Sequence, residues 1–389
     1  MEKILRYAFE LISFALNGTA VSEETKAALN QQTYERLFQV TNKYDLAHIV
    51  AEALDRNELY PTTDPAAAMF TKARRTAIYR YERMRYDCEQ ISQAFESAKI
   101  PYLPLKGMVL REYYKEPWFR TSCDIDVLVR ETDLERAAEL LKDKYGYTQA
   151  TGKTLHDLSL YSISNGHLEL HFRLIEIGAA EKAEEKILSE VWERSELVKG
   201  SEYRYSMTDE MFYFFHVLHM AKHFRSGGCG IRPFLDLWLL DRQTDRSTEK
   251  RLELLERGGL RTFAVAASEL ADAWLSGKEL SDEQEQLQKF LLETGMYGNT
   301  ERRVMIQQQK KGGARYVLGM IFLPYRQLKL KYPVLVKWPI LYPFLTVWRW
   351  ICAPFKRKRW RQHRAQLKLL SENSEKKQTT AELLKRLEL

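Results

Sequence analysis

Strand patterns occur in only one stretch of the sequence, residues 99–172, and this restricts the fold more than any other feature. The stretch begins with Pro101 and Pro104 on either side of a short apolar run, which suits an edge strand and excludes a helix interior. Gly107 then permits a tight turn into a short helix. A β-branched run at residues 123–129 predicts a strand that is buried on at least one face.

The remainder of this stretch predicts one helix and one hairpin. Apolar residues at helical spacing predict a helix that stops at Gly146. Alternating residues over 160–172 predict two strands joined by a turn at Asn165 and Gly166. The order strand, helix, strand, helix, hairpin predicts a small unit of mixed α and β structure.

Helical spacing dominates on both sides of this unit. The clearest example is an apolar stripe that runs from Tyr81 to Ala98 at intervals of three and four residues. Helical patterns return at Thr208 and continue to about residue 325. We therefore expect four segments: a helical region (1–98), a core (99–200), a helical domain (201–325) and a basic, aromatic-rich C-terminal region (326–389).

Charge is distributed unevenly along the chain. The sequence has 60 Lys and Arg and 53 Asp and Glu, for a net charge of +7. Residues 302–368 contain 17 Lys and Arg, no acidic residue, and several aromatic residues next to the basic ones. This pattern indicates an anionic partner, either nucleic acid or a membrane surface. A solvated basic face, or a helical hairpin packed back on the body, has the same charge pattern.

The cysteines and the apolar segments favour a location in the cytoplasm. The four cysteines are far apart and show no CxxC spacing, which argues against a disulfide framework or a zinc ribbon and favours reducing conditions. Glu2 and Glu10 stand where a signal peptide would be basic and then continuously apolar, so the N-terminus is interpreted as an amphipathic helix. The most apolar window, residues 338–348, contains two prolines and is too short to span a bilayer. We expect a cytoplasmic protein whose membrane contact, if any, is peripheral.

Two aspartates mark the candidate chemistry. Asp124 and Asp126 are two residues apart on a predicted strand, so their side chains point to the same face. Adjacent carboxylates repel each other unless a cation neutralises them, and hard oxygen ligands suit Mg²⁺. An Asp-X-Asp sequence by itself is also common at polar strand ends.

The predicted hairpin adds a third carboxylate. Strand alternation places His167, Glu169 and His171 on one face and the intervening leucines on the other. Three carboxylates on two strands, after a glycine turn at a helix N-terminus, predict a two-metal site for phosphoryl or nucleotidyl transfer. His167 and His171 do not predict a zinc site, because histidines four residues apart on a strand are separated by about 13 Å.

These residues resemble a known family. The motif Leu105-Lys106-Gly107, the run from Arg120 to Asp126 and the motif Leu168-Glu169-Leu170-His171 are similar to the uncharacterised bacterial nucleotidyltransferase family of the DNA polymerase beta-like nucleotidyltransferase superfamily. The likeness is most specific over residues 100–175. It is weaker at residues 216–240 and 316–350.

The resemblance implies an α+β fold, in which a polymerase-beta-like core with a small mixed sheet is flanked by helical regions. It implies a phosphate-holding turn at Gly107, paired catalytic metal ligands at Asp124 and Asp126, and a third at Glu169. The implied cofactor is Mg²⁺ or Mn²⁺. The implied reaction moves a nucleoside monophosphate from an NTP such as ATP to an unidentified acceptor and releases pyrophosphate.

Three further residues complete the expected nucleotide site. The family's glycine is usually followed by Gly or Ser, whereas Met108 follows Gly107 here. Lys106 either supplies the phosphate-binding charge instead or is a solvated lysine. Arg120 either clamps a phosphate or partners nearby acids. His171, next to the third carboxylate, is the other expected nucleotide contact.

A stripe of histidines marks the helical domain. His216, His219 and His223 lie on one helix face. Such a stripe can bind metal but is more often polar residues in a core or interface. We interpret this domain as the far wall of the cleft, with His219, Arg232 or Asp236 helping to hold substrate.

Two alternatives to an enzyme stay open. The altered glycine motif favours a catalytically inactive protein of the same fold that binds or regulates. The basic C-terminal region favours an adaptor for anionic surfaces.

Overall fold

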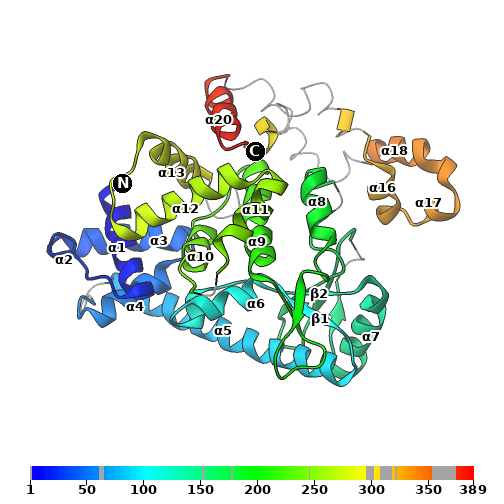
Figure 1. The fold of residues 1–389 in the computed structure, drawn as a ribbon, viewed down its shortest axis with the longest axis horizontal. Helices are drawn as coiled ribbons and strands as arrows, with labels where there is room; N and C mark the ends of the chain where they lie inside the picture. The colour runs from blue at the N-terminus through cyan, green and yellow to red at the C-terminus, as the bar shows by residue number, and fades with distance from the viewer. Residues whose placement is uncertain are drawn as a thin grey trace.

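The computed structural model has an α+β architecture in which a five-stranded sheet and a separate two-stranded sheet lie among helices (Figure 1). This confirms the predicted fold class. The basic run at residues 356–361 lies outside the described residues. The structure describes residues 2–60, 65–150, 154–176, 178–244, 246–294, 302–306, 318–319, 322–352 and 374–389.

Helices make up the N-terminal quarter of the chain, as the sequence predicts. They are α1 (Glu2–Asn17), α2 (Glu23–Ala28), α3 (Gln31–Lys43), α4 (Ala47–Arg56) and α5 (Pro65–Ser97). The apolar stripe on α5 explains its position, because Met84, Ile91 and Phe95 are buried against one face of the sheet. Figure 1 shows α5 running along the lower side of the molecule toward the strands.

The sheet has five strands in the order β1-β2-β5-β4-β3. Strands β2 and β5 are parallel, and the other neighbours are antiparallel. The strands are β1 (Tyr102–Pro104), β2 (Asp124–Val129), β3 (Thr148–Gln149), β4 (Asp157–Tyr161) and β5 (His167–His171). The short elements among them are α6 (Gly107–Leu110), η1 (Arg111–Tyr113), η2 (Pro117–Phe119), η3 (Glu131–Asp133) and α7 (Leu134–Tyr145).

The two faces of the sheet differ in polarity. Ile125 and Val127 of β2 and Leu168 and Leu170 of β5 are at most 1% exposed and belong to an apolar cluster with α5 and α7. The opposite face carries the acidic and histidine side chains of the same two strands. Strand alternation thus orients the predicted site residues as the sequence indicates.

The predicted hairpin is confirmed, but its loop is wider than a two-residue turn. Ser162 N–H donates to the carbonyl of Gly166, and only Asn165 adopts a left-handed conformation, with φ 64°. Gly166 is required for space, because a Cβ there would lie 2.1 Å from a carboxylate oxygen of Asp87 on α5.

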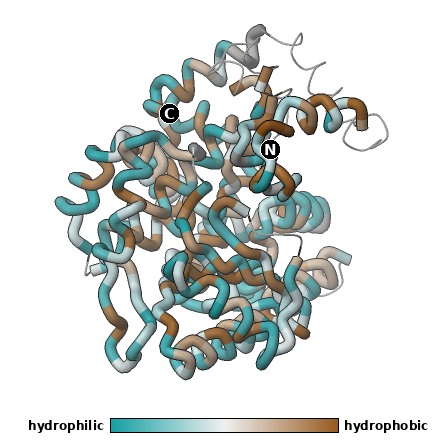
Figure 2. Tube along the Cα trace, turned by 90° about the vertical axis from the view of Figure 1, so that its right-hand side faces the viewer, coloured by the Kyte–Doolittle hydropathy of each residue, from teal (hydrophilic) through white to brown (hydrophobic). Residues whose placement is uncertain are grey.

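A helical layer lies on the polar side of the sheet. Its helices are α8 (Lys182–Ser189), α9 (Asp209–Arg225), α10 (Arg232–Leu240), α11 (Thr248–Gly258), α12 (Arg261–Ser276) and α13 (Asp282–Thr294). Between α8 and α9, β6 (Ser195–Leu197) and β7 (Tyr205–Met207) form the separate two-stranded sheet, and β7 contacts β1. Helix α12 packs against both α10 and α1, so the N-terminal helices and this layer share one apolar core. Figure 2 shows apolar stretches concentrated in the middle of the molecule.

The C-terminal region contains a small group of helices and a last helix. They are α16 (Tyr325–Lys331), α17 (Val334–Lys337), η4 (Pro339–Leu341), α18 (Tyr342–Ile351) and α20 (Ser374–Arg386). Among the described residues, no helix combines the length and apolarity needed to cross a membrane. The four-segment division of the chain stays a prediction.

Candidate active site

A cleft of about 360 Å³ lies between the polar face of the sheet and helices α9 and α10. Strands β2 and β5 supply Asp124, Asp126, Glu169 and His171 to its lining. A larger hollow of about 580 Å³ lies beside Trp192 and contains none of these four residues. The smaller cleft is therefore where the predicted chemistry is concentrated.

The register of the parallel pair explains why the carboxylates meet. Asp126 lies opposite Glu169, and Asp124 lies opposite His167. One ligand atom each from Asp126, Glu169 and His171 lie within 4.8 Å of one another. Asp124 lies on the same strand face and lines the cleft, but outside this group of three.

Lys106 pairs with the buried carboxylate. Its Nζ lies 2.7 Å from Oδ1 of Asp126, and Nε2 of His171 lies 2.9 Å from the same oxygen. The His171 Nε2 also lies 3.4 Å from Oε2 of Glu169. Of the two alternatives for Lys106, a solvated lysine is wrong, because its side chain is only 22% exposed and faces Asp126.

The turn before α6 differs from the expected glycine turn. The left-handed residue is Lys106, with φ 40°, whereas Gly107 has no positive φ. Gly107 instead lies in a crowded place, since a Cβ there would lie 3.0 Å from Oγ of Ser122 and 3.3 Å from a guanidinium nitrogen of Arg120. A non-glycine residue in this conformation is costly, so the surrounding contacts of Lys106 must hold it there.

The two aspartates have opposite pKa shifts. Burial and the neighbouring Asp126 raise the pKa of Asp124 above its ordinary value. Burial also acts to raise the pKa of Asp126, but Lys106 and His171 outweigh it and hold that pKa well below the usual range. Lys106 and His171 therefore stabilise the ionised form of Asp126.

The carboxylates fit a hard divalent cation. They offer oxygen donors from two adjacent strands, and the buried charge of Asp126 is balanced by a lysine and a histidine. A bound cation would provide the same compensation for the repulsion that acts on Asp124. The residues that would hold Mg²⁺ or Mn²⁺ are Asp124, Asp126 and Glu169.

Helix α9 forms the far wall, as the sequence predicts for His219. His216, His219 and His223 all line the cleft. Burial, and then the charge of Lys106, lower the pKa of His219 well below its ordinary value. Burial and Lys222 lower the pKa of His223 to about 4. The rings of His219 and His223 are therefore neutral near pH 7. The cationic side chains that line the cleft are those of Lys106, Lys222, Arg120 and Arg232.

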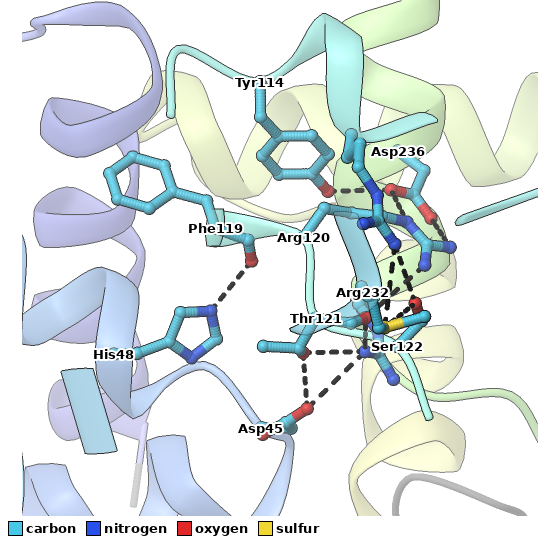
Figure 3. A network of polar contacts seen from close by, with 11 residues as sticks. Asp45, His48, Tyr114, Phe119, Arg120, Thr121, Ser122, Arg232 and Asp236 are labelled. Carbon is cyan, nitrogen blue, oxygen red and sulfur yellow. Dashed lines mark hydrogen bonds and ion pairs between the residues drawn. The ribbon is translucent and has the colours of Figure 1, made fainter. Parts of the chain in front are cut away.

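Arg120 and Asp236 meet each other in the floor of the cleft (Figure 3). Nε of Arg120 lies 3.1 Å from Oδ1 of Asp236, and Nη2 lies 2.9 Å from Oδ2. The hydroxyl of Tyr114 donates to the same carboxylate at 2.8 Å. Arg120 is 11% exposed and the Asp236 side chain is 0% exposed. Two roles were expected for Arg120, and this geometry supports the second, in which the guanidinium is the partner of an acid.

Arg232, also in the floor of the cleft, contacts the loop before β2 and the segment between α3 and α4. Its guanidinium donates to the carbonyl and, at 2.9 Å, to the hydroxyl of Thr121, and lies 3.5 Å from Asp45 (Figure 3). His48 of α4 contacts the carbonyl of Phe119 at 2.8 Å. These contacts fix the loop that leads into β2, and they therefore position Asp124.

Two residues of the cleft were missed at the sequence level. Lys222 of α9 lines the cleft, and its spacing of three residues from His219 was the available signal. His156, just before β4, also lines it. Nothing local distinguishes His156, because its position depends on the pairing of β4 with β5.

A mixed sheet that presents an Asp-X-Asp pair and a third carboxylate to a helix-walled cleft is the arrangement expected of the nucleotidyltransferase class. The sequence pattern of the uncharacterised nucleotidyltransferase family matches residues 30–276, so the chain belongs to this family. The match leaves out residues 316–350, where the weaker likeness stays a prediction. No curated protein and no solved structure matches the chain.

Proposed function

We propose that the protein is a Mg²⁺-dependent nucleotidyltransferase that transfers a nucleoside monophosphate from an NTP to an acceptor. The observation that carries the proposal is the register of β2 and β5, which brings Asp126 opposite Glu169 with Asp124 on the same face. Membership in a nucleotidyltransferase family supports it.

The reaction joins an acceptor oxygen to the α-phosphorus of the NTP and breaks the bond between that phosphorus and the oxygen that bridges to the β-phosphate. Pyrophosphate leaves with the bridging oxygen, and the acceptor proton passes to a carboxylate of the cluster. Bound Mg²⁺ supplies charge neutralisation of the triphosphate and of the leaving oxygen.

The chain's own residues bind and orient the substrate in this proposal. Lys106 and Lys222 supply positive charge on opposite sides of the cleft for the phosphates. The neutral rings of His219 and His223 and the aromatic side chain of Phe215 supply a wall for the base or the acceptor. Arg120 and Asp236 stabilise the floor beneath them.

Glu169 provides the test of this function. Glu169→Gln should weaken Mg²⁺-dependent NTP binding at least tenfold, by an order-of-magnitude estimate for one lost charged ligand. Leu168→Ala is the matched control on the opposite face and should lower the melting temperature through a cavity costing about 2–5 kcal/mol. Thermal shift with and without Mg²⁺ and each NTP measures both effects.

The thermal shift, together with a measurement of pyrophosphate release, separates the enzyme from its alternatives. An inactive binding protein would show the NTP shift without any pyrophosphate release. An adaptor for anionic surfaces would be stabilised by polyanions without nucleotide selectivity. A Leu168→Ala variant that loses NTP binding while Glu169→Gln keeps it would contradict the proposed register.

We also propose that helices α16–α18 bind the surface of an anionic lipid bilayer. These helices pack on one another around the buried Leu328 and Leu335, at one edge of the molecule in Figure 1. Their outer side chains are apolar and more than half exposed. The most exposed are Val336, Trp338, Ile340, Phe344, Val347, Trp348 and Ile351.

Charge complementarity favours a lipid surface over other partners. Residues 322–352 contain no acidic residue, and Lys329, Lys337 and Arg349 lie among the exposed apolar side chains. Tryptophan and aliphatic side chains beside basic residues suit the boundary between headgroups and acyl chains. Nucleic acid would use the basic and aromatic residues but not an aliphatic residue such as Ile340.

Sedimentation with vesicles tests the lipid proposal. Vesicles that contain phosphatidylglycerol should bind the protein, more weakly as salt rises, whereas pure phosphatidylcholine vesicles should not. Phe344→Ser with Trp348→Ser should reduce binding about tenfold or more, and Tyr79→Ser, an exposed site on α5, should not. Neutralising the basic run at residues 356–359 should also weaken it. If the protein binds oligonucleotides and the Phe344→Ser, Trp348→Ser variant binds them equally well, the lipid proposal is contradicted.

A further inference from the structure

His171 also belongs to a second cluster of potential ligands. One ligand atom each from His156, Asp157 and His171 lie within 4.8 Å of one another. Asp157 of β4 is paired directly with His171 of β5, and His156 immediately precedes β4. His156 and His171 also line the cleft.

The hydrogen bonds of His171 determine which nitrogen is free. Its Nε2 lies 2.9 Å from Asp126 and 3.4 Å from Glu169, and an ionised carboxylate only accepts, so Nε2 carries a proton. A metal ion that binds Nδ1 takes the place of any proton on that nitrogen. Nδ1 has no hydrogen-bond partner among the described residues, and the side chain is 2% exposed. A buried polar atom of this kind is costly unless something binds it.

Thr154 orients the side chains of His156 and Asp157, the other two members of this cluster. Its hydroxyl donates to Oδ1 of Asp157 and lies 3.2 Å from Nδ1 of His156. The same hydroxyl oxygen accepts from the backbone N–H groups of His156 and Asp157, at 3.2 and 3.0 Å, so Thr154 holds both residues at the start of β4. Nε2 of His156 and Oδ2 of Asp157, which lie 3.9 Å apart, are left to bind a ligand.

We propose that His156 Nε2, Asp157 Oδ2 and His171 Nδ1 bind one Zn²⁺ ion. Two imidazoles and one carboxylate are a zinc donor set, whereas Mg²⁺ prefers oxygen ligands alone. Ligand atoms on a tetrahedral zinc ion are separated by about 3.4 Å, so the three side chains need to close by about 1 Å.

Each proposed zinc ligand also has a hydrogen-bond partner that orients its side chain, as is usual in metal sites. Thr154 orients His156 and Asp157, and the carboxylates of Asp126 and Glu169 orient His171. The ion would fix the His171 ring with Nε2–H directed at Asp126. This site is separate from the proposed Mg²⁺ site, because none of its three ligands is among Asp124, Asp126 and Glu169.

Metal titration of the chelator-treated full chain tests the inference. Calorimetry should give one Zn²⁺ per chain, and Co²⁺ should give the visible absorption of a low-coordinate site. His156→Ala and Asp157→Asn should each weaken Zn²⁺ binding about a hundredfold or more, and Thr154→Val about tenfold. His167→Ala is the matched control, since His167 lies on the same strand outside this cluster, and it should leave Zn²⁺ affinity unchanged.

Three results would overturn the inference. They are no Zn²⁺ binding by the wild-type chain, binding that survives both His156→Ala and Asp157→Asn, and binding that Glu169→Gln abolishes while His156→Ala preserves it. The last would place the ion among the carboxylates instead. Melting temperatures of all variants, measured without metal, separate loss of a ligand from loss of the fold.

Discussion

Asp124→Asn and Asp126→Asn should each reduce NTP turnover about a thousandfold, corresponding to about 4 kcal/mol of lost transition-state stabilisation. Either change removes a negative charge from the candidate metal site at nearly constant shape. Pyrophosphate release from an NTP, with an acceptor-containing extract, measures the loss. Retained turnover in both variants would exclude the nucleotidyltransferase assignment.

The two variants should differ in stability. If repulsion between the two carboxylates were the only effect, removing either charge would raise the melting temperature equally. Asp124→Asn should keep or raise the melting temperature without metal, because burial and Asp126 already disfavour its charge. Asp126→Asn should lower it, because the change leaves Lys106 and His171 without their ionised partner. Breaking such a buried pair costs about 3 kcal/mol. Asp133→Asn, a change outside the cleft, controls for the substitution itself.

Asp236→Ala should destabilise the fold by about 3–5 kcal/mol, because it leaves the buried guanidinium of Arg120 and the hydroxyl of Tyr114 without their acceptor. We expect the melting temperature to fall by about 5 °C or more. Glu131→Ala removes a salt bridge to Arg173 in which both side chains are about half exposed, 57% and 47%, and it should cost under about 1 kcal/mol.

A double-mutant cycle identifies what Arg120 does. If Arg120 acts through Asp236, Arg120→Leu with Asp236→Leu should cost clearly less than the sum of the two single changes. Additive losses of stability, together with a loss of NTP affinity confined to Arg120→Leu, would instead assign Arg120 to the phosphates.

Local pattern was sufficient for the elements that carry the site. Alternation along residues 123–129 and 167–171 depends only on the period of a strand, so the polar and apolar faces of β2 and β5 follow from the sequence. The helical stripe on α5 likewise predicts the face that packs on the sheet. The resemblance of three short motifs led to the family that the comparison confirms.

Contacts between distant residues required the tertiary structure. Lys106 pairs with Asp126, and Arg120 pairs with Asp236, across 20 and 116 residues of chain. No spacing rule reports such pairs, because they depend on how β1, β2 and α10 are placed in space. The expected glycine turn was wrong in detail for the same reason, since the crowding at Gly107 comes from Ser122 and Arg120.

The sequence by itself determined the residue types of the candidate site, the strand faces on which they lie, and the family. Those properties are local, because a strand repeats every two residues and a motif is contiguous. Only the tertiary structure decided that helix α9 closes the cleft over the carboxylates, that N-terminal helices share a core with α12, and that His156 lies near His171. These depend on packing and strand pairing between segments that no local period connects.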